Sequence, residues 1–473
     1  MAFSNYFMHS LIGNFVFSGT GLGYRGQVGP FYYTLFAMKK IILIAYIICC
    51  IKTATAQTNN YSELIAKKAS QIEQKLIEWR HDIHQNPELG NRETRTASLV
   101  AKHLQSLGIE VKTEVAVTGV VGILKGDKPG PVIALRADMD GLPVTENNNL
   151  PFASKVRTIY NGKETGVMHA YGHDGHVAIL MGVAEILSGM KKELRGTVKF
   201  IFQPAEEGSP VGEEGGAELM LKEGVLQNPK VDVIFGLHLS AATEVGKINY
   251  RPAGTMAASA DLKIVVKGKP SHGAYPWQSI DPIVVSAQII NSLQTIVSRN
   301  VQLTQNAAVV TIGSIHGGNR HNIISEEVEM LETVRTFTKE DEEFVFRRIR
   351  EIATKTAEAA GATAEVSLPY SSYNPVTFNN VELTIAMLPS LQKTVGKENV
   401  FLIPAVTGAE DFSFYQEKVP GLYFFVRGMK KGQDPSKVGP HHTPEFLIDD
   451  SAFKTGMNVL CNLVFDYTAF DKK

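Results

Sequence analysis

Apolar residues recur along this chain with two spacings, that of an amphipathic helix and that of a buried strand. Residues 62–85 and 93–107 carry them at helical intervals, and the first segment stops at Asn86-Pro87, where proline disfavours continuation. From residue 120 onward, short apolar runs alternate with helical segments. Because strands buried on both faces have nearly continuous apolar sequences, this alternation predicts an α/β fold: a mostly parallel sheet with helices on both faces.

Acidic residues and a histidine, whose side chains can bind ligands or transfer protons, follow the predicted strands of this sheet. The strands at 132–135 and 197–202 lead into acidic residues, and the strand at 231–237 ends at a histidine. In sheets of this kind, ligands bind beyond the carboxyl ends of the strands. We therefore expect one shared site at that edge, built from Asp138, Asp140, Glu206, Glu207 and His238.

The pattern changes near residue 252. From there the predicted order is strand, helix, two strands, helix and strand, at 261–266, 281–299, 308–315, 326–336, 339–360 and 363–367. This β-α-β-β-α-β order is that of the ferredoxin-like α+β fold. Helices at 381–395 and 451–465 and a strand at 422–426 then return to the first pattern. We predict a first domain in two parts, 57–251 and 369–473, with an inserted domain at 252–368.

The segment before residue 57 has the features of a signal peptide. Lys39 and Lys40 precede an uncharged apolar run at 41–51, and Ala54-Thr55-Ala56 matches a cleavage site. The run is too short to cross a bilayer, which takes roughly 20 residues. We expect a signal peptide at 38–56, an upstream extension at 1–37, and a mature protein that is exported to the periplasm or secreted. The alternative is a cytosolic protein with an apolar leader helix.

Composition excludes some partners. The 473 residues are 44% hydrophobic and 20% charged, as in ordinary globular proteins of two or more domains. A net charge of -1 gives no reason to expect nucleic acid or an anionic membrane as a partner. Of the three cysteines only Cys461 lies beyond the signal peptide, so the mature chain cannot form an internal disulfide.

The residue types at the expected site are those of a divalent metal centre. Three histidines and an aspartate lie within residues 169–176, and the pair Glu206-Glu207 follows an apolar strand. One of two adjacent carboxylates can bind the metal while the other takes the proton from a metal-activated water. Packed core histidines and a solvated loop are the alternative, but convergence at strand ends favours a metal-dependent hydrolase. Spacing alone does not decide whether His441 or His442 faces the site.

Seven motifs, in order, resemble the M20 metallopeptidase family. The resemblance runs from about residue 62 to the C-terminus. It is strongest to the amidohydrolase branch, which comprises N-acyl-L-amino acid amidohydrolases, hippurate hydrolases and IAA-amino acid hydrolases. The motifs are the segments 136–143 (RADMDGLP), 168–176 (MHAYGHDGH), 203–207 (QPAEE), 236–238 (GLH), 271–276 (SHGAYP), 410–412 (EDF) and 442–444 (HTP).

This resemblance assigns roles to individual residues. It implies a catalytic domain with an inserted lid and one or two divalent ions, Zn²⁺ or Mn²⁺, held by His173, Glu207, His238 and His442. It makes Glu206 the general base and the lid residue His272 a donor to the developing oxyanion. It also implies that Asn322 and Arg335 hold the carboxylate of the substrate.

The chain departs from the family pattern at two positions. Tyr171 stands where the branch usually carries a cysteine ligand, and a phenol with a pKa near 10 binds metal poorly. Glu332 stands where the family favours glycine.

Together these observations predict an exported hydrolase that cleaves the amide bond of N-acyl amino acids. A dipeptidase or carboxypeptidase of the same family is the alternative enzyme. An exported binding protein, its metal site degraded by Tyr171, is the non-enzymatic alternative. A serine hydrolase is disfavoured because the mature chain has no G-x-S-x-G motif. An exposed edge strand on the lid offers a route to a homodimer.

Overall fold

The computed structural model describes residues 61–470, so the expected signal peptide at 38–56 and the extension at 1–37 lie outside the described residues. Two main sheets are present, one of eight strands and one of five. Within residues 61–470 no helix combines the length and the apolarity needed to cross a membrane.

The eight-stranded sheet has a parallel centre. Its strand order is β1-β2-β6-β3-β7-β19-β8-β18, and the four central strands β6, β3, β7 and β19 run parallel to one another. At one edge β2 is antiparallel to both of its neighbours, β1 and β6, and near the other edge β8 is antiparallel to β19. The strands are β1 (Glu110–Val115), β2 (Gly119–Lys125), β3 (Lys128–Asp138), β6 (Arg195–Gln203), β7 (Val233–Glu244), β8 (Ile248–Tyr250), β18 (Val400–Leu402) and β19 (Gly421–Met429).

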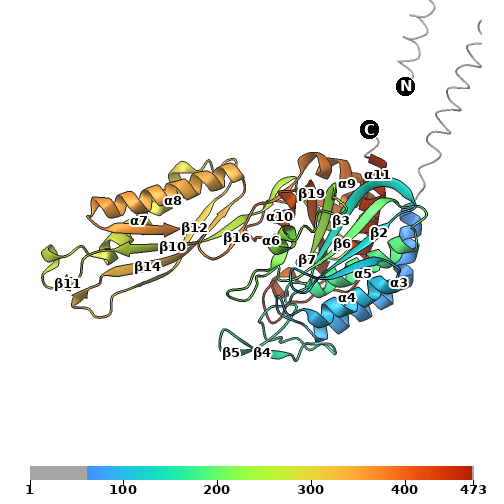
Figure 1. Cartoon of the computed structure of the whole chain (residues 1–473), viewed down its shortest axis with the longest axis horizontal. Coiled ribbons are helices and arrows are strands. Elements are labelled where there is room, and N and C mark those ends of the chain that lie inside the picture. The colour runs from blue at the N-terminus through green and yellow to red at the C-terminus, as the bar shows by residue number, and fades with distance from the viewer. Residues whose placement is uncertain (1–60, 471–473) are drawn as a thin grey trace, which may run out of the picture. The chain divides into compact units, whose positions relative to one another are not determined.

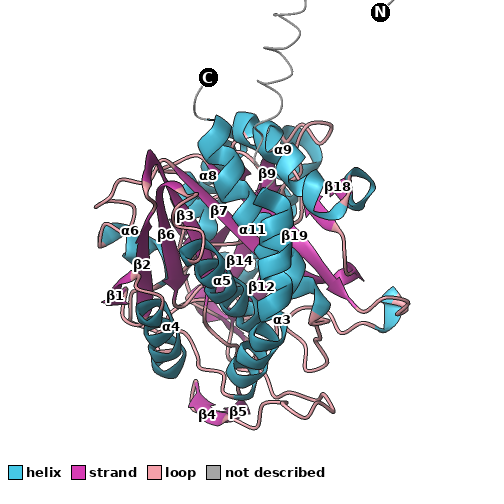
Figure 2. Cartoon of the chain, turned by 90° about the vertical axis from the view of Figure 1, so that its right-hand side faces the viewer, coloured by secondary structure: helices cyan, strands magenta, loops and turns pink. Residues whose placement is uncertain are grey.

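Helices cover both faces of this sheet, as predicted. Five long helices and the apolar side chains of one face form a single core (Figure 2). They are α3 (Tyr61–Gln85), α4 (Thr94–Ser106), α5 (His173–Ser188), α9 (Val381–Val395) and α11 (Ser451–Phe470). The short helices α6 (Gly216–Lys222) and α10 (Phe412–Gln416) contribute to a second core on the other face. Successive residues of β3 alternate between these cores, with Ile133 and Leu135 in the first and Ala134 in the second.

Three features of this domain differ from expectation. β7 does not end at His238 but continues to Glu244, because β19 pairs with it from Gly421↔Ile234 to Met429↔Glu244. β1 and the hairpin of β4 (Arg157–Tyr160) and β5 (Lys163–Gly166) were not predicted. Their side chains are mostly exposed and lack the apolar run that marks a buried strand.

The lid has its own sheet and its own core. β10 (Ala258–Lys267), β12 (Val309–Gly317), β14 (Glu327–Thr336) and β15 (Thr363–Ser367) are antiparallel in the order β12-β14-β10-β15, which is the ferredoxin-like order. α7 (Pro282–Thr295) and α8 (Lys339–Ala359) lie along one face of this sheet (Figure 1). Asp281 caps α7 by accepting a hydrogen bond from Ile283 N, and Thr338 caps α8 in the same way.

Short strands form three further pairings in the lid and at its junction with the larger domain. β16 (Tyr373–Asn374) pairs with the beginning of β10, at Ser259↔Asn374. β11 (Ser271–His272) pairs with β13 (Ile323–Ile324) in a separate two-stranded ribbon. β9 (Ala253–Met256) and β17 (Thr377–Asn379) pair where the chain enters and leaves the lid.

Candidate metal centre

The expected site residues gather at the carboxyl ends of the central parallel strands. Asp138 is the last residue of β3, and Glu206 and Glu207 lie just beyond the end of β6. The turn between β6 and the glutamates is tight, with Ala205 at φ +50° and its amide bound by Glu93 Oε1 at 2.8 Å. His173 is the first residue of α5, preceded by Gly172 at φ +99°. That backbone conformation favours glycine, and it starts the helix at the sheet edge.

Two histidines are held so that one ring nitrogen stays free. Nδ1 of His173 lies 3.0 Å from the backbone oxygen of Asp140, and Nδ1 of His238 lies 2.6 Å from the backbone oxygen of Leu239. A ring nitrogen facing a carbonyl oxygen carries the proton, so the lone pair of the neutral ring is on Nε2. In both histidines Nε2 is buried and has no hydrogen-bond partner among the described residues. This is the arrangement of metal-ligating histidines.

Glu207 supplies a third free ligand atom. Its backbone amide donates to Oδ2 of Asp140 at 2.9 Å, which fixes the residue beside His173. Its Oε1 is buried and, within the part of the chain that the structure describes, accepts no hydrogen bond of good geometry. It does lie 2.9 Å from Nε2 of His442, whose ring is about half exposed. The backbone amide of His442 donates to the backbone oxygen of Ala170 at 2.9 Å, and this hydrogen bond holds His442 at the site.

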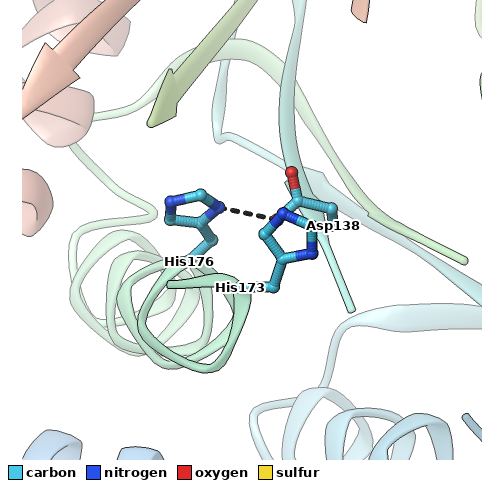
Figure 3. A group of neighbouring side chains, drawn as sticks. All are labelled: Asp138, His173 and His176. Atoms are coloured by element: carbon cyan, nitrogen blue, oxygen red, sulfur yellow. Dashed lines mark hydrogen bonds and ion pairs between the residues drawn. The ribbon is translucent and has the colours of Figure 1, made fainter. Parts of the chain in front are cut away.

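Three groups of histidines and carboxylates have ligand atoms within 4.8 Å of one another, and hydrogen bonding distinguishes them. In the first, Asp138 and His176 are bonded at 2.6 Å (Figure 3), and Nε2 of His176 also accepts from Leu239 N at 2.8 Å. Both nitrogens of His176 are therefore in use. In the third group, Glu410 and Asp411 are bound by Arg136 at 3.0 and 2.7 Å. Within residues 61–470, the second group, His173, Glu206 and Glu207, is the one in which two residues, His173 and Glu207, keep a buried ligand atom without a hydrogen-bond partner.

The electrostatics of the pocket favour a cation. Burial lowers the pKa of His173, but Asp138 and Asp140 outweigh this effect and raise it to about 10. The site thus stabilises a positive charge, which can be a proton or a metal ion that displaces it. His238 is different, because burial and the neighbouring His176 hold its pKa well below its ordinary value. Its ring is neutral and available as a ligand.

Glu206 lies beside these ligands in a buried position. Its Oε2 is 3.9 Å from Nε2 of His173, and its Oε1 lies 3.4 Å from the amide nitrogen of Asp411. Burial, followed by the charges of Glu410 and Glu207, raises the pKa of Glu206 well above its ordinary value. A carboxylate with a raised pKa next to a cation site is suited to accept and return a proton.

Comparison with known proteins identifies the family. The family described as peptidase family M20/M25/M40 matches residues 134–466. The chain belongs to this family. Thermostable carboxypeptidase 2 of Saccharolobus solfataricus is 40% identical over 400 residues, covering 83% of this chain and 95% of that protein. N-acetylcysteine deacetylase of Bacillus subtilis is 39% identical over 393 residues, covering 82% and 96%.

A solved structure agrees with this assignment. A protein of Bacillus subtilis described as a dinuclear metal-binding peptidase of the M20 family has a TM-score of 0.70 and 34% identity, covering 85% of this chain and 99% of that one. The predicted family and fold are confirmed, and so is a hydrolase acting on carbon–nitrogen bonds. These relatives favour the enzyme over the binding protein. Residues 1–55 separately match a family of unknown function, DUF418.

At the M20 centre the ring of Tyr171 lies among the histidines. Ring centroids are separated by 4.2 Å from His238, 4.4 Å from His442 and 4.6 Å from His441. His441 is more buried than His442, and its Nε2 also lacks a hydrogen-bond partner within residues 61–470. Burial and the charge of His442 lower the pKa of His441 to about 4. Of the adjacent pair, His442 is the one that touches Glu207.

The lid residues implied by the family do not meet within one chain. His272 is exposed on β11, where its Nδ1 accepts from Ala274 N at 3.0 Å, and Gly273 N donates to the backbone of Asn322 at 2.8 Å. Arg335 lies near the other end of β14, bonded to the hydroxyls of Ser259 and Thr333. At a rise of about 3.3 Å per residue, β14 spans roughly 26 Å from Glu327 to Arg335, and Asn322 precedes the Glu327 end.

Arg335 is at the end of the lid sheet that reaches a pocket over the metal centre. Its register partner Ser259 pairs with Asn374, which lines this pocket of about 430 Å³ together with Tyr171, Glu206, Glu207 and His442. Arg335 can therefore serve a substrate in the same chain, whereas His272 and Asn322 belong to the opposite end.

A buried network behind the ligands had no predicted role. Asp174, next to His173, accepts from Arg80 Nε at 2.7 Å and lies 2.8 Å from Nδ1 of His84. Nε2 of His84 in turn contacts Glu146 at 3.1 Å. Arg80 and His84 are four residues apart in α3, on the face that packs on the core. A polar pair on an apolar helix face was the available signal in the sequence.

Proposed function

We propose that this M20 protein is an exported amidohydrolase that cleaves the amide bond of N-acyl amino acids. The observation that carries the proposal is the pair of buried ligand atoms without hydrogen bonds among the described residues, on His173 and Glu207, beside the buried Glu206. A buried polar atom left unpaired is costly unless a ligand satisfies it. The donor set of two imidazoles and a carboxylate suits Zn²⁺ or Mn²⁺.

His173, Glu207, His238 and His442 are the residues available to hold metal. When bound, a divalent ion supplies Lewis acidity and lowers the pKa of water from about 15.7 to about 7. Glu206 takes a proton from the attacking water and passes it to the leaving amine, so that the amine departs neutral. Arg335 pairs with the carboxylate of the substrate at the pocket end of the lid sheet. His272 of a second copy of the chain donates to the oxyanion, a contribution typically worth about 3 kcal/mol.

A Glu206→Gln variant tests the central assignment. The amide keeps the size of the side chain but cannot accept the proton, so turnover should fall by about 10²-fold to 10⁴-fold. Metal content should stay that of the wild type, because the proposed ligands are unchanged. Turnover is measured as amine release from N-acetyl and N-benzoyl amino acids with Zn²⁺ or Mn²⁺ added. Metal content is measured by elemental analysis. Turnover near the wild-type rate would remove Glu206 from its role.

A dipeptidase or carboxypeptidase remains the second candidate. The relative named thermostable carboxypeptidase 2 supports it, and an arginine that holds a carboxylate serves peptides as well as N-acyl amino acids. Dipeptides therefore belong in the same substrate panel. Faster release from dipeptides than from N-acetyl and N-benzoyl amino acids would favour this candidate.

We further propose that two copies associate through their lids. β12 is an edge strand of the lid sheet, with Ile315 about half exposed. An unpaired strand edge can pair with the same edge of a second copy. Such a dimer would also offer a route by which His272 and Asn322 reach the site of the partner.

Export rests on the sequence of residues 38–56. N-terminal sequencing of the protein recovered from the periplasm or the medium should begin at Gln57. Recovery of the uncleaved chain from the cytosol would contradict export and leave the catalytic proposal untouched.

A further inference from the structure

The ring of Tyr171 fills space between the histidines of the metal centre. Its centroid is 4.2 Å from the ring of His238 and 4.4 Å from that of His442, the distances of aromatic rings in direct contact. The ring of His441 packs edge-on at 4.6 Å. Carbon atoms of Tyr171 therefore pack directly against the imidazoles of both His238 and His442.

The candidate ligand atoms near this ring do not all belong to one group. His173, Glu206 and Glu207 form a group with ligand atoms within 4.8 Å of one another, and Nε2 of His442 lies 2.9 Å from Glu207 Oε1. Ligands bonded at about 2.0–2.2 Å to one ion lie roughly 3–4 Å apart, so this set can close on a single ion. His238 belongs to none of the groups of three found among the described residues.

Tyrosine is a poorly shaped replacement for a short ligand at this position. Its only ligand atom is the hydroxyl oxygen, which is separated from Cβ by the whole ring. The first atoms beyond Cβ are ring carbons, which bind no metal. A residue with its ligand atom next to Cβ could bridge two ions between these histidines, but Tyr171 occupies the same volume without offering a donor there.

We propose that Tyr171 restricts the centre to one divalent ion per chain, held by His173, Glu207 and His442, with its ring in the place of a second ion. His238 then packs against this ring. The related Bacillus subtilis peptidase is described as dinuclear, so a single-ion centre would be a difference from that relative. The inference rests on the proposed function, because it presumes that the centre binds metal.

Metal stoichiometry in two variants tests the inference. Tyr171→Cys removes the ring and places a thiolate next to Cβ, a strong zinc ligand with bonds of about 2.3 Å. Tyr171→Phe is the matched control, because it keeps the ring and removes only the hydroxyl. After incubation with excess Zn²⁺ and desalting, elemental analysis should give one ion for the wild type, one for Tyr171→Phe and two for Tyr171→Cys. Equal melting temperatures would show that all three chains are folded.

Each other outcome has a distinct meaning. Two ions in the wild type, or one in Tyr171→Cys, would overturn the inference but not the proposed function. Loss of the ion in Tyr171→Phe would also overturn it, because the hydroxyl would then be the ligand. A wild type that binds no ion under these conditions would overturn the proposed function together with it.

A spectroscopic measurement on the wild type alone does not depend on the variants. Loaded with excess Mn²⁺ and desalted, the protein should give the electron paramagnetic resonance spectrum of isolated Mn²⁺. The spectrum of an exchange-coupled pair of ions would contradict the single-ion centre.

Discussion

The side chain of Asp140 and the backbone amide of Glu207 are joined by a hydrogen bond of 2.9 Å. The backbone oxygen of the same aspartate lies 3.0 Å from Nδ1 of His173. One residue just beyond β3 therefore positions one ligand from the start of α5 and another from the loop after β6. Contacts of this kind commonly change metal affinity by 10-fold to 100-fold when they are removed.

Asp140→Ala should therefore weaken metal binding. It removes the hydrogen bond to Glu207 and the negative charge beside His173, while the backbone contact to His173 remains. We expect the dissociation constant for Zn²⁺ to rise by about 10-fold to 100-fold, measured by competition with a chromogenic chelator. Asp127→Ala is the control, because Asp127 is exposed beside the opposite end of β3. Affinity within twofold of the wild type in Asp140→Ala would contradict this role.

The edge at which the site forms could be predicted because parallel strands share one carboxyl end. Glu206 and Glu207 follow an apolar run, and in the structure they meet His173 at that edge. The helices at 62–85 and 381–395 were also predictable from local sequence, because their apolar residues recur at the spacing of an α-helix. Asp140 was predicted near the site. Its contacts with His173 and Glu207 were not, because they depend on how three segments far apart in the sequence come together.

Buried polar pairing was not predictable from local pattern. Arg136 contacts Asp138, Glu410 and Asp411, which lie two to 275 residues away in sequence. No periodicity links such positions. The separation of Asn322 from Arg335 was missed for a related reason, because it follows from the length and direction of β14 and not from either residue.

Mixed dimers test whether His272 acts on the partner. His272→Ala alone should lower turnover by about 10²-fold, the rate equivalent of about 3 kcal/mol. In a dimer of one Glu206→Gln chain and one His272→Ala chain, a site built from both chains keeps its base and its donor. Such a dimer, isolated by two affinity tags, should recover about half of the wild-type activity.

A site within one chain gives the opposite result. Each half of the mixed dimer would then lack either Glu206 or His272, and activity would stay at the level of the variants. Light scattering on the wild type provides the prior measurement. A monomer at the assay concentration would contradict both the dimer and the shared site.

Glu332 gives a prediction about pH and stability. The residue lies on β14 between Leu262 and Ile312, on the buried face of the lid sheet, and neither carboxylate oxygen has a hydrogen-bond partner in the part of the chain described. Burial raises its pKa from 4.5 to about 7. The folded chain therefore binds this proton more tightly than the unfolded chain, and stability falls as the pH rises from about 4.5 through 7.

Glu332→Gln should remove this dependence. The amide has the same size and no charge, so the variant should unfold at a higher temperature than the wild type at pH 8, with a gain of about 2–3 kcal/mol. At pH 5 the wild-type carboxyl is mostly protonated, and the two melting temperatures should nearly coincide. Glu327→Gln, on the exposed face of the same strand, is the control and should show no such pH-dependent gain. A difference between wild type and Glu332→Gln that is equal at pH 5 and pH 8 would show that the carboxyl does not titrate in this range.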